Sequence, residues 1–352
     1  MKQMGIIYNY YIFEAFSIRL LKRGNIMLDK KYRIPSSLSL FQETFYKHLI
    51  NWKWKHVTTD PGLFQEREYD ALLPDSLQDQ QIPVYKPIIE ELRKHDFKPH
   101  KQYGKHMASS QAACINLFTP LLRNPDIANE VLSQINPSFK RLATDHLESG
   151  FQFEYWDTSN PLNDHTPAAG TDSDIAIAYY NDNDELCLWL IEHKLTEKEF
   201  STCGGYRSSG NKNKDWCRSQ TVLADHDKCY YQHSCDYKYW KLTDESNLFN
   251  ESAMKERPEC PFLGGENQLW RNQLMAFAIQ KQGEYKNVHF SVVLHHSNLH
   301  LDETISRYKE LLNAPEELTT FTSRDLIKAA EGFENGELQD WIAWFKDLYL
   351  IS

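Results

Sequence analysis

Two neighbouring stretches of this chain read GTDSDIAIA at residues 170–178 and LWLIEHKL at residues 188–195. Both runs are rich in isoleucine, leucine, alanine and aromatic residues, and together they favour strands. The segment NDND at residues 181–184 lies between them and is dense in turn formers. This pattern predicts a β-hairpin whose strand ends carry acids and a lysine.

The charged side chains of this hairpin are expected to gather on common faces. Side chains alternate between the two faces of a strand, so Asp172 and Asp174 share one face. By the same rule Glu192 and Lys194 point the same way, while His193 points to the other side. A hairpin that brings one aspartate beside Glu192 and Lys194 therefore builds a pocket with two carboxylates and one ammonium.

Such a pocket suits a Mg²⁺-dependent phosphodiesterase, because carboxylate oxygens are preferred by hard divalent cations. Mg²⁺ held by Asp174 and Glu192 would polarise a phosphoryl oxygen and lower the pKa of a bound water. Lys194 would orient that water or offset charge in the transition state, and the backbone carbonyl of His193 would complete the metal shell. The alternative is an ion-paired surface hairpin without a catalytic role. The fully apolar run at residues 188–191 favours the functional interpretation, because it predicts a strand buried on both faces.

These residues resemble the PD-(D/E)xK nuclease superfamily, which has the restriction-endonuclease-like fold. The match is Asp174 at the start of an apolar strand, followed by Glu192-His193-Lys194 as the E-x-K element; Ser173 stands where the motif has proline. The resemblance covers approximately residues 130–300. It implies an α/β fold with a mixed β-sheet core flanked by helices, hydrolysis of nucleic-acid phosphodiester bonds with Mg²⁺ (or Mn²⁺), and a catalytic set. That set is Asp174, Glu192 and Lys194.

Two further acids enter the expected metal set, which is Asp174, Glu192, Asp172 and Glu154. Glu154 lies in the alternating segment 151–156, which predicts a strand. In this superfamily an acid from the first helix or strand sometimes joins the metal site. A solvent-facing strand residue is the alternative for Glu154.

The remaining core elements fall where this fold requires them. Residues 129–147 have helix-like spacing, broken by Pro137, and residues 267–280 predict an amphipathic helix that leads into an apolar strand at 288–294. Gln268 and Arg271 begin that helix, and some families of the superfamily place a glutamine there to touch the site or the DNA. Helix N-terminal amides also suit a phosphate. Solvated side chains on a packed helix are the alternative.

An insertion of different character occupies residues 200–263. Residues 201–241 carry seven Lys/Arg and four Asp, a local charge of plus three in a chain whose total is minus ten. A basic, aromatic-bearing insertion beside a metal site is what a nucleic-acid contact surface would look like. The candidate contacts are Arg207, Lys212, Lys214 and Arg218. An ordinary solvated loop is the alternative.

The same insertion holds five of the seven cysteines, which are Cys203, Cys217, Cys229, Cys235 and Cys260. Their thiolates are candidates for a structural Zn²⁺ site, with His226 or His233 as substitutes, or for an iron–sulfur cluster. No CxxC pair is present, and free reduced thiols are the alternative. Disulfides are not expected, because seven is odd and no secretory signal is evident.

Composition predicts a soluble cytoplasmic protein without a membrane span, because no run of eighteen apolar residues occurs. We expect four parts: an N-terminal extension at 1–27, a helical region at 28–128, the nuclease core at 129–300, and a C-terminal helical cap at 301–352. Met27 is an alternative start. Helices are predicted at residues 38–54, 87–97, 109–122 (ended by Pro120), 304–312 and 338–348.

These observations favour a Mg²⁺-dependent nuclease that cleaves DNA, and the resemblance implies a role in restriction or defence. The competing hypothesis is a nucleic-acid-binding module that keeps the fold and a structural zinc site but has no turnover. The complete set of Asp174, Glu192 and Lys194 favours the nuclease. RNA as substrate and a homodimeric state remain open, because neither leaves a readable trace in these residues.

Overall fold

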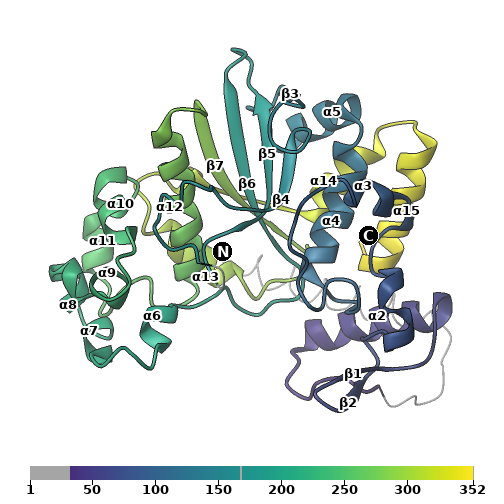
Figure 1. Ribbon diagram of the computed structural model, residues 1–352, viewed down its shortest axis with the longest axis horizontal. Coiled ribbons are helices and arrows are strands. Elements are labelled where there is room, and N and C mark those ends of the chain that lie inside the picture. The colour runs from purple at the N-terminus through teal and green to yellow at the C-terminus, as the bar shows by residue number, and fades with distance from the viewer. Residues whose placement is uncertain (1–31, 167–168, 352) are drawn as a thin grey trace, which may run out of the picture. The chain divides into compact units, whose positions relative to one another are not determined.

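A six-stranded mixed β-sheet lies between two layers of helices (Figure 1). The computed structural model describes residues 32–166 and 169–351, so the predicted extension at 1–27 lies outside the described residues. The strands are β3 (Arg141–Leu142), β4 (Phe151–Tyr155), β5 (Ser173–Tyr180), β6 (Leu186–Lys194), β7 (Asn287–Leu294) and β8 (Leu318–Thr322). This architecture confirms the predicted mixed sheet flanked by helices.

The strand order is β3-β5-β6-β7-β8. β4 also pairs with β5, at residues 173–177, whereas β3 pairs with β5 at residues 179–180. β5 is antiparallel to β4 and β6, whereas β6, β7 and β8 run parallel to one another. The register sets Ile175 opposite Ile191 across the β5–β6 pair. The predicted hairpin is confirmed, as are the predicted strands that became β4 and β7.

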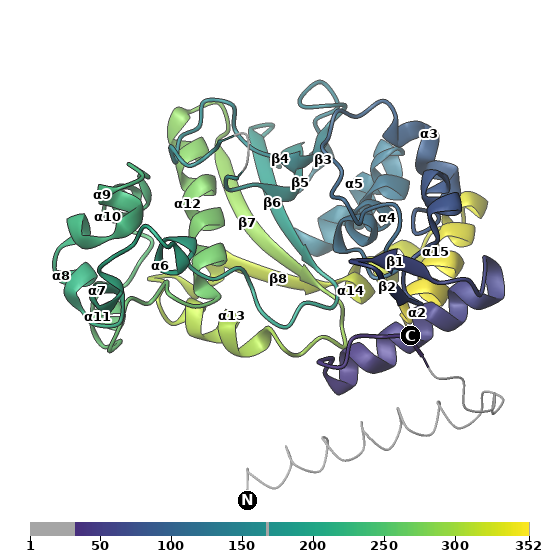
Figure 2. The same ribbon diagram turned by 60° about the horizontal axis from the view of Figure 1, so that its bottom comes forward.

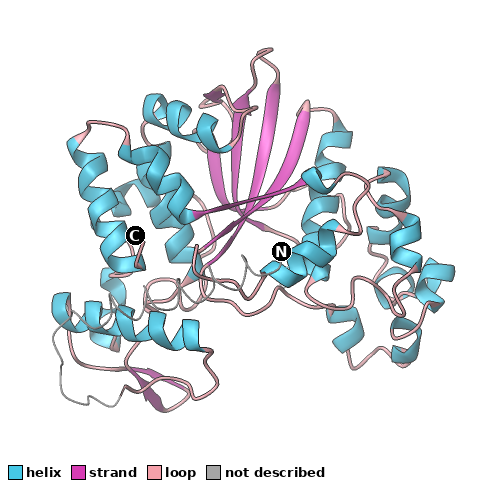
Figure 3. Cartoon of the chain, turned by 180° about the vertical axis from the view of Figure 1, so that it is seen from behind, coloured by secondary structure: helices cyan, strands magenta, loops and turns pink. Residues whose placement is uncertain are grey.

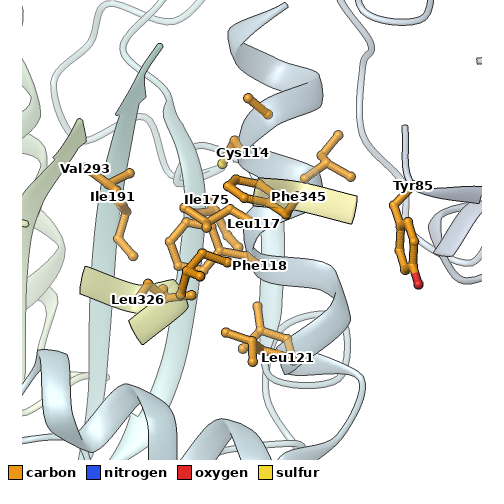
Figure 4. Close-up of a cluster of buried hydrophobic side chains, with 14 of the residues drawn as sticks. Tyr85, Cys114, Leu117, Phe118, Leu121, Ile175, Ile191, Val293, Leu326 and Phe345 are labelled. Atoms are coloured by element: carbon orange, nitrogen blue, oxygen red, sulfur yellow. The ribbon is translucent and has the colours of Figure 1, made fainter. Parts of the chain in front are cut away.

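One face of the sheet is covered by four helices: α4 (Ser110–Leu122), α5 (Pro125–Ile135), α14 (Ser323–Glu331) and α15 (Gly336–Tyr349). Alternate side chains of β5 and β6 supply the apolar contacts on this side. Figure 4 shows Leu117 and Phe118 of α4 beside Ile175, with Ile191 and Leu326 in the same cluster. All five side chains are essentially inaccessible to solvent.

The opposite face packs against α12 (Glu266–Gln282), which in turn contacts α10 (Tyr239–Ser246) and α13 (Asp302–Lys309). Figure 3 shows the helices on both sides of the sheet from behind. Here the sheet presents Ala176, Ala178, Leu188 and Leu190, the side chains that alternate with those of the first face. Because β5 and β6 are buried on both faces, their sequences read as nearly continuous apolar runs.

The insertion between β6 and α12 is built from short helices gathered beyond α12 (Figure 2). They are α6 (Gly204–Arg207), α7 (Lys214–Cys217), α8 (Thr221–Ala224), η3 (His226–Lys228), α9 (Tyr230–His233), α10 and α11 (Glu251–Lys255). Four of them, α6 to α9, span only four residues each. Side-chain packing and local turns therefore hold this segment together, because helices so short have little stability of their own.

The N-terminal part contains α2 (Leu40–His56), the small hairpin β1 (Gly62–Phe64) and β2 (Arg67–Tyr69), η1 (Asp75–Gln80), η2 (Lys86–Ile88) and α3 (Ile89–Leu92). A capping box at Ser39 begins α2, which confirms the predicted helix there. The β1–β2 hairpin is not among the predicted elements. Its three-residue strands are too short to show a period in the sequence.

Three predictions about helix ends are wrong. The helix expected at residues 87–97 ends at Leu92, after the short elements η2 and α3. The helix expected at residues 129–147 ends at Ile135, before Pro137, and the chain then forms β3. Pro120 does not end α4, which continues to Leu122. Proline lacks the N–H that would bond to the carbonyl of Asn116, and the indole N–H of Trp341 donates to that carbonyl instead, at 2.7 Å.

The segment predicted as a C-terminal helical cap contributes a strand to the sheet. β8 pairs in parallel with β7, so that Phe290 lies opposite Leu318. The sequence predicts neither β8 nor α14, whereas the helices expected at 304–312 and 338–348 are confirmed as α13 and α15 with shifted ends. In the described residues, no helix is long and apolar enough to cross a membrane.

We expect Phe118→Ala to lower the free energy of unfolding by about 3–5 kcal/mol, because it removes a fully buried ring and leaves a cavity. Urea unfolding followed by circular dichroism measures the loss. Leu299→Ala is the matched control, since that side chain is 61% exposed, and its effect should stay within about 0.5 kcal/mol. Equal effects of the two substitutions would contradict the assignment of this core.

Candidate active site

The sheet brings the acids of β5 and β6 together at one edge. Asp174 stands at the start of β5, and Glu192 is near the end of β6, one position beyond the Ile175–Ile191 pair. The Oδ2 atom of Asp174 accepts a hydrogen bond from the backbone N–H of His193 at 2.6 Å. The register of one hairpin therefore sets the carboxyl group of Asp174 against the segment that carries Glu192.

Glu192 is 5% exposed and each of its carboxylate oxygens has partners. Its Oε1 lies 2.8 Å from Nζ of Lys194 and accepts a hydrogen bond from Nε2 of Gln268 at 2.7 Å. Its Oε2 accepts from Nδ2 of Asn272 at 3.2 Å. Two side chains of α12, one turn apart, thus orient this carboxylate from the helix that covers the sheet.

Lys194 is held as a cation. Burial by itself lowers the pKa of this lysine. The charge of Glu192, with smaller contributions from Glu197 and Asp174, outweighs burial and raises the pKa above its ordinary value. A lysine that stays protonated cannot accept a proton at neutral pH. It can offset negative charge or donate a hydrogen bond to a water or a phosphoryl oxygen.

The carboxyl groups hold their protons more tightly than usual. Burial, followed by the charge of Glu192, raises the pKa of Asp174 well above its ordinary value. Burial likewise raises the pKa of Glu154 to about 7, with added repulsion from Asp172 and Glu192 and an opposing hydrogen bond from Gln111. The charges of these acids therefore act on one another, as is typical of a functional site.

Glu154 sits in β4 with the left-handed backbone angle φ of +49°, which a side chain other than glycine rarely adopts. Its position lies opposite Asp174, because Phe153 pairs with Ile175 and Tyr155 pairs with Ser173. Nε2 of Gln111, in the first turn of α4, donates to its Oε1 at 2.6 Å. Local backbone strain of this kind is concentrated at functional sites.

Asp172 occupies a more open position just before β5. Its Oδ1 lies 2.7 Å from Nε2 of His165, and its side chain is 40% exposed. The His165 ring stacks on Trp156 with centroids 3.6 Å apart and planes 3° from parallel. A Cβ at Gly170 would lie 2.1 Å from the His165 ring, so this close approach requires glycine.

The donor chemistry of this edge fits a hard divalent cation. Asp174 and Glu192 offer carboxylate oxygens, and their mutual repulsion is what a bound cation would relieve. The carbonyl of His193, which the sequence suggested as a third donor, accepts a hydrogen bond from Oγ of Ser110 at 2.9 Å. As the side chains stand, no group of three or more His, Cys, Asp or Glu within residues 32–166 and 169–351 is arranged to hold a metal ion.

Sequence reasoning missed Asn272, Gln111, Ser110 and His165. A signal exists for Asn272, because it follows Gln268 by four residues and so shares its helix face. The other three come from segments that only the tertiary structure brings to the site, and their spacing in the chain carries no signal.

A buried polar network connects the insertion to the loop before β5. Asp164 accepts hydrogen bonds from the hydroxyl of Tyr239, at 2.6 Å, and from that of Thr171, which precedes Asp172. Nη1 of Arg271 donates to Oγ1 of Thr171 at 3.0 Å. Arg271 is thus engaged within the protein, and its suggested contact with nucleic acid stays a prediction.

The basic side chains of the insertion lie mostly at the surface. Arg207, Lys212 and Arg218 are exposed and Lys214 is half-buried. The guanidinium of Arg218 and the ammonium of Lys214 stand 5.4 Å and 5.7 Å from the Tyr206 ring centroid. Gln268, the other suggested contact, donates to Glu192 inside the site.

All five insertion cysteines are free thiols, and three of them are buried. The amide of Cys260 donates to the carbonyl of Cys217 at 2.9 Å, and the amide of Tyr206 donates to Sγ of Cys203 at 3.3 Å. Burial raises the pKa of Cys203 to about 11, with added effects of Cys229 and Cys217. The segments that carry Cys203, Cys217, Cys229 and Cys260 therefore converge, and a metal bound there stays a prediction.

A family model described as "Restriction Endonuclease associating with ARP" matches residues 47–350. No curated protein and no solved structure matches the chain.

Without a metal, we expect the protein to lose stability as the pH rises from about 5 to 8. The pKa of Glu154 is raised from about 4.5 in the unfolded chain to about 7 in the folded protein, so the folded protein binds this proton more tightly. The resulting contribution to the free energy of unfolding is complete below about pH 4.5. That contribution, of the order of 3 kcal/mol, is lost as the pH rises through 7. Urea unfolding in EDTA at several pH values, for the wild type and Glu154→Gln, measures it.

The variant should show a shallower decline than the wild type, because it keeps the side-chain shape without the titration. Asp174 contributes a change of the same sign in both proteins. Because the charge of Glu154 also raises the pKa of Asp174, the difference between the two curves measures Glu154 together with its effect on Asp174. Parallel curves for the two proteins would refute the assignment.

Proposed function

Because the chain belongs to the family of restriction endonucleases associating with ARP, we propose that it cleaves DNA with Mg²⁺ (or Mn²⁺) at Asp174, Glu192 and Lys194. The family supports a nuclease acting on nucleic acid. The observation that carries the finer proposal is the buried pair of Glu192 and Lys194 beside Asp174, at the edge where β5 begins and β6 ends.

The charge of each side chain indicates its proposed role in the reaction. Asp174 and Glu192 would hold the metal, which supplies a Lewis acid and lowers the pKa of its water. Lys194 carries a positive charge at neutral pH, so it positions the attacking water or offsets charge on the phosphoryl group. Gln268 and Asn272 fix the direction of the Glu192 carboxylate through their hydrogen bonds.

The binding-only alternative is weaker on physical grounds. A protein that only binds nucleic acid gains nothing from two enclosed carboxyl groups at its contact face, because they repel phosphate. Burying Glu192 and Lys194 removes two charges from water, which is unfavourable for stability. A catalytic role gives a reason for keeping the pair at this position. A structural zinc or iron–sulfur site on the insertion is compatible with either function.

Binding would use the exposed cations of the insertion. Arg207, Lys212 and Arg218 suit phosphate contacts, which give affinity without sequence choice. A chain with a total charge of minus ten has to confine such contacts to one surface. DNA is the proposed substrate, and parallel assays with RNA decide between the two polymers.

We expect Asp174→Asn and Lys194→Ala to reduce Mg²⁺-dependent cleavage of supercoiled DNA by on the order of 10²–10³-fold while binding persists. Loss of a metal ligand or of the cation removes charge stabilisation but leaves the contact surface. Asn272→Ala should cost less, about 10- to 100-fold, because it acts through Glu192. Gel assays with Mg²⁺, Mn²⁺ and EDTA provide the measurement.

The controls are Asp182→Asn and Lys140→Ala, two exposed residues at the far end of the hairpin, 3.7 Å apart as an ion pair. Both should cleave as the wild type does. Wild-type cleavage by Asp174→Asn would rule out this site.

Replacing Arg207, Lys212 and Arg218 together by alanine should weaken DNA binding and flatten its dependence on salt. Each lost phosphate contact is expected to reduce the slope of log K against log [salt] by about 1. Fluorescence anisotropy at several salt concentrations gives the slope. Lys55→Ala, an exposed lysine of α2, is the control, and an unchanged slope in the triple variant would exclude the insertion as the contact surface.

A further inference from the structure

A cavity of about 650 Å³ opens beside the candidate active site. Two of its lining residues, Glu154 and Asp172, belong to the acids described above. The lining also includes the side chains that could recognise a nucleotide, which are Lys98, Gln152, Trp156 and His165. Glu154 lies opposite Asp174 in the β4–β5 pair, so a strand whose phosphate lay at Asp174 would bring its neighbouring nucleotide to this cavity.

Three lining side chains carry donors that the fold does not use. Within the described part of the chain, Lys98, Gln152 and Trp156 form no hydrogen bond or ion pair through their side chains. Gln152 projects from β4 on the same side as Glu154 and is half-buried, in the alternating pattern of that strand. An amide with both a donor and an acceptor is suited to the edge of a nucleobase.

The cavity also has an aromatic wall. Trp156 and His165 form a parallel stack 3.6 Å apart, and the tight approach to Gly170 fixes the histidine ring. Stacking on aromatic side chains is the usual way in which proteins bind an unpaired base. The wall would accept any base, because every base has a π face.

The charges of the lining argue for a base and against a second phosphate. Glu154 and Asp172 line the cavity, and Asp96 is a third acid in its wall, against the single lysine Lys98 among the described lining residues. These acids repel a phosphate, whereas a neutral base tolerates them. The volume falls in the range of small-ligand pockets and is far smaller than a duplex segment requires.

We propose that this cavity receives the unstacked base of the nucleotide next to the scissile phosphate. The inference rests on the proposed nuclease function and deepens it. A base enters such a pocket only when it has left the helix, and that costs least at a mismatch or in a single strand. The preferred substrate is therefore DNA with an unpaired base beside the cleavage position.

The test is binding and cleavage of three oligonucleotide probes: a matched duplex, a duplex with one mismatched 2-aminopurine, and a single strand containing 2-aminopurine. Binding is measured in EDTA, so that it does not depend on cleavage. The wild type should prefer the unpaired probes and change the 2-aminopurine fluorescence. Trp156→Ala and Gln152→Ala should lose about five- to a hundredfold of affinity for the unpaired probes, with little effect on the matched duplex.

Two control variants separate loss of stacking from general effects of substitution. Trp156→Phe retains a ring and should preserve most of the preference, and Gln134→Ala, an exposed glutamine of α5, should behave as the wild type. In cleavage assays, loss of the stacking ring should raise KM for the unpaired probes more than it lowers kcat. Circular dichroism checks that Trp156→Ala is folded, and Gln152→Ala supplies a second variant.

Two failures are distinguishable. If Asp174→Asn abolishes cleavage but Trp156→Ala and Gln152→Ala bind and cleave all three probes as the wild type does, the base pocket is overturned and the nuclease stands. If no probe is cleaved with Mg²⁺ or Mn²⁺ yet the two variants lose the preference for unpaired probes, the pocket is supported and the nuclease proposal fails.

Discussion

The burial of β5 and β6 on both faces is the constraint on which the rest of this structure depends. Neither strand has a face for solvent, so each requires a helical layer on either side. The parallel pairing of β6 with β7 then demands a long crossover, and the chain places α12 and the insertion there. The polar side chains at the ends of these strands are consequently enclosed and must find partners.

That enclosure explains the electrostatics of the candidate site. Away from bulk water, the carboxyl groups of Asp174 and Glu154 hold protons more tightly, and Lys194 remains charged because Glu192 is its direct partner. Because Glu192 is also enclosed, losing a hydrogen bond to its carboxylate would leave a buried polar atom unsatisfied. The amides of Gln268 and Asn272 satisfy it from a helix whose own position is fixed by the apolar face of the sheet.

The insertion is physically coupled to the site although it is remote in sequence. Tyr239 in α10 binds Asp164, which also binds Thr171 beside Asp172, and Arg271 joins the group from α12. A disturbance of the insertion would therefore reach the loop that carries Asp172. This coupling gives the insertion a positional role alongside any contact with nucleic acid.

Sequence by itself determined the hairpin, because apolar runs with a dense turn between them leave few other structures. It also determined the helix α12 and the pairing of Glu192 with Lys194 on one face, since both follow from local periodicity. Only the tertiary structure decided that β8 completes the sheet, that Trp341 replaces the hydrogen bond lost at Pro120, and that Gln111 and Asn272 reach the acids. These contacts join segments far apart in the chain, and local spacing carries no information about which distant side chain will satisfy a buried polar group.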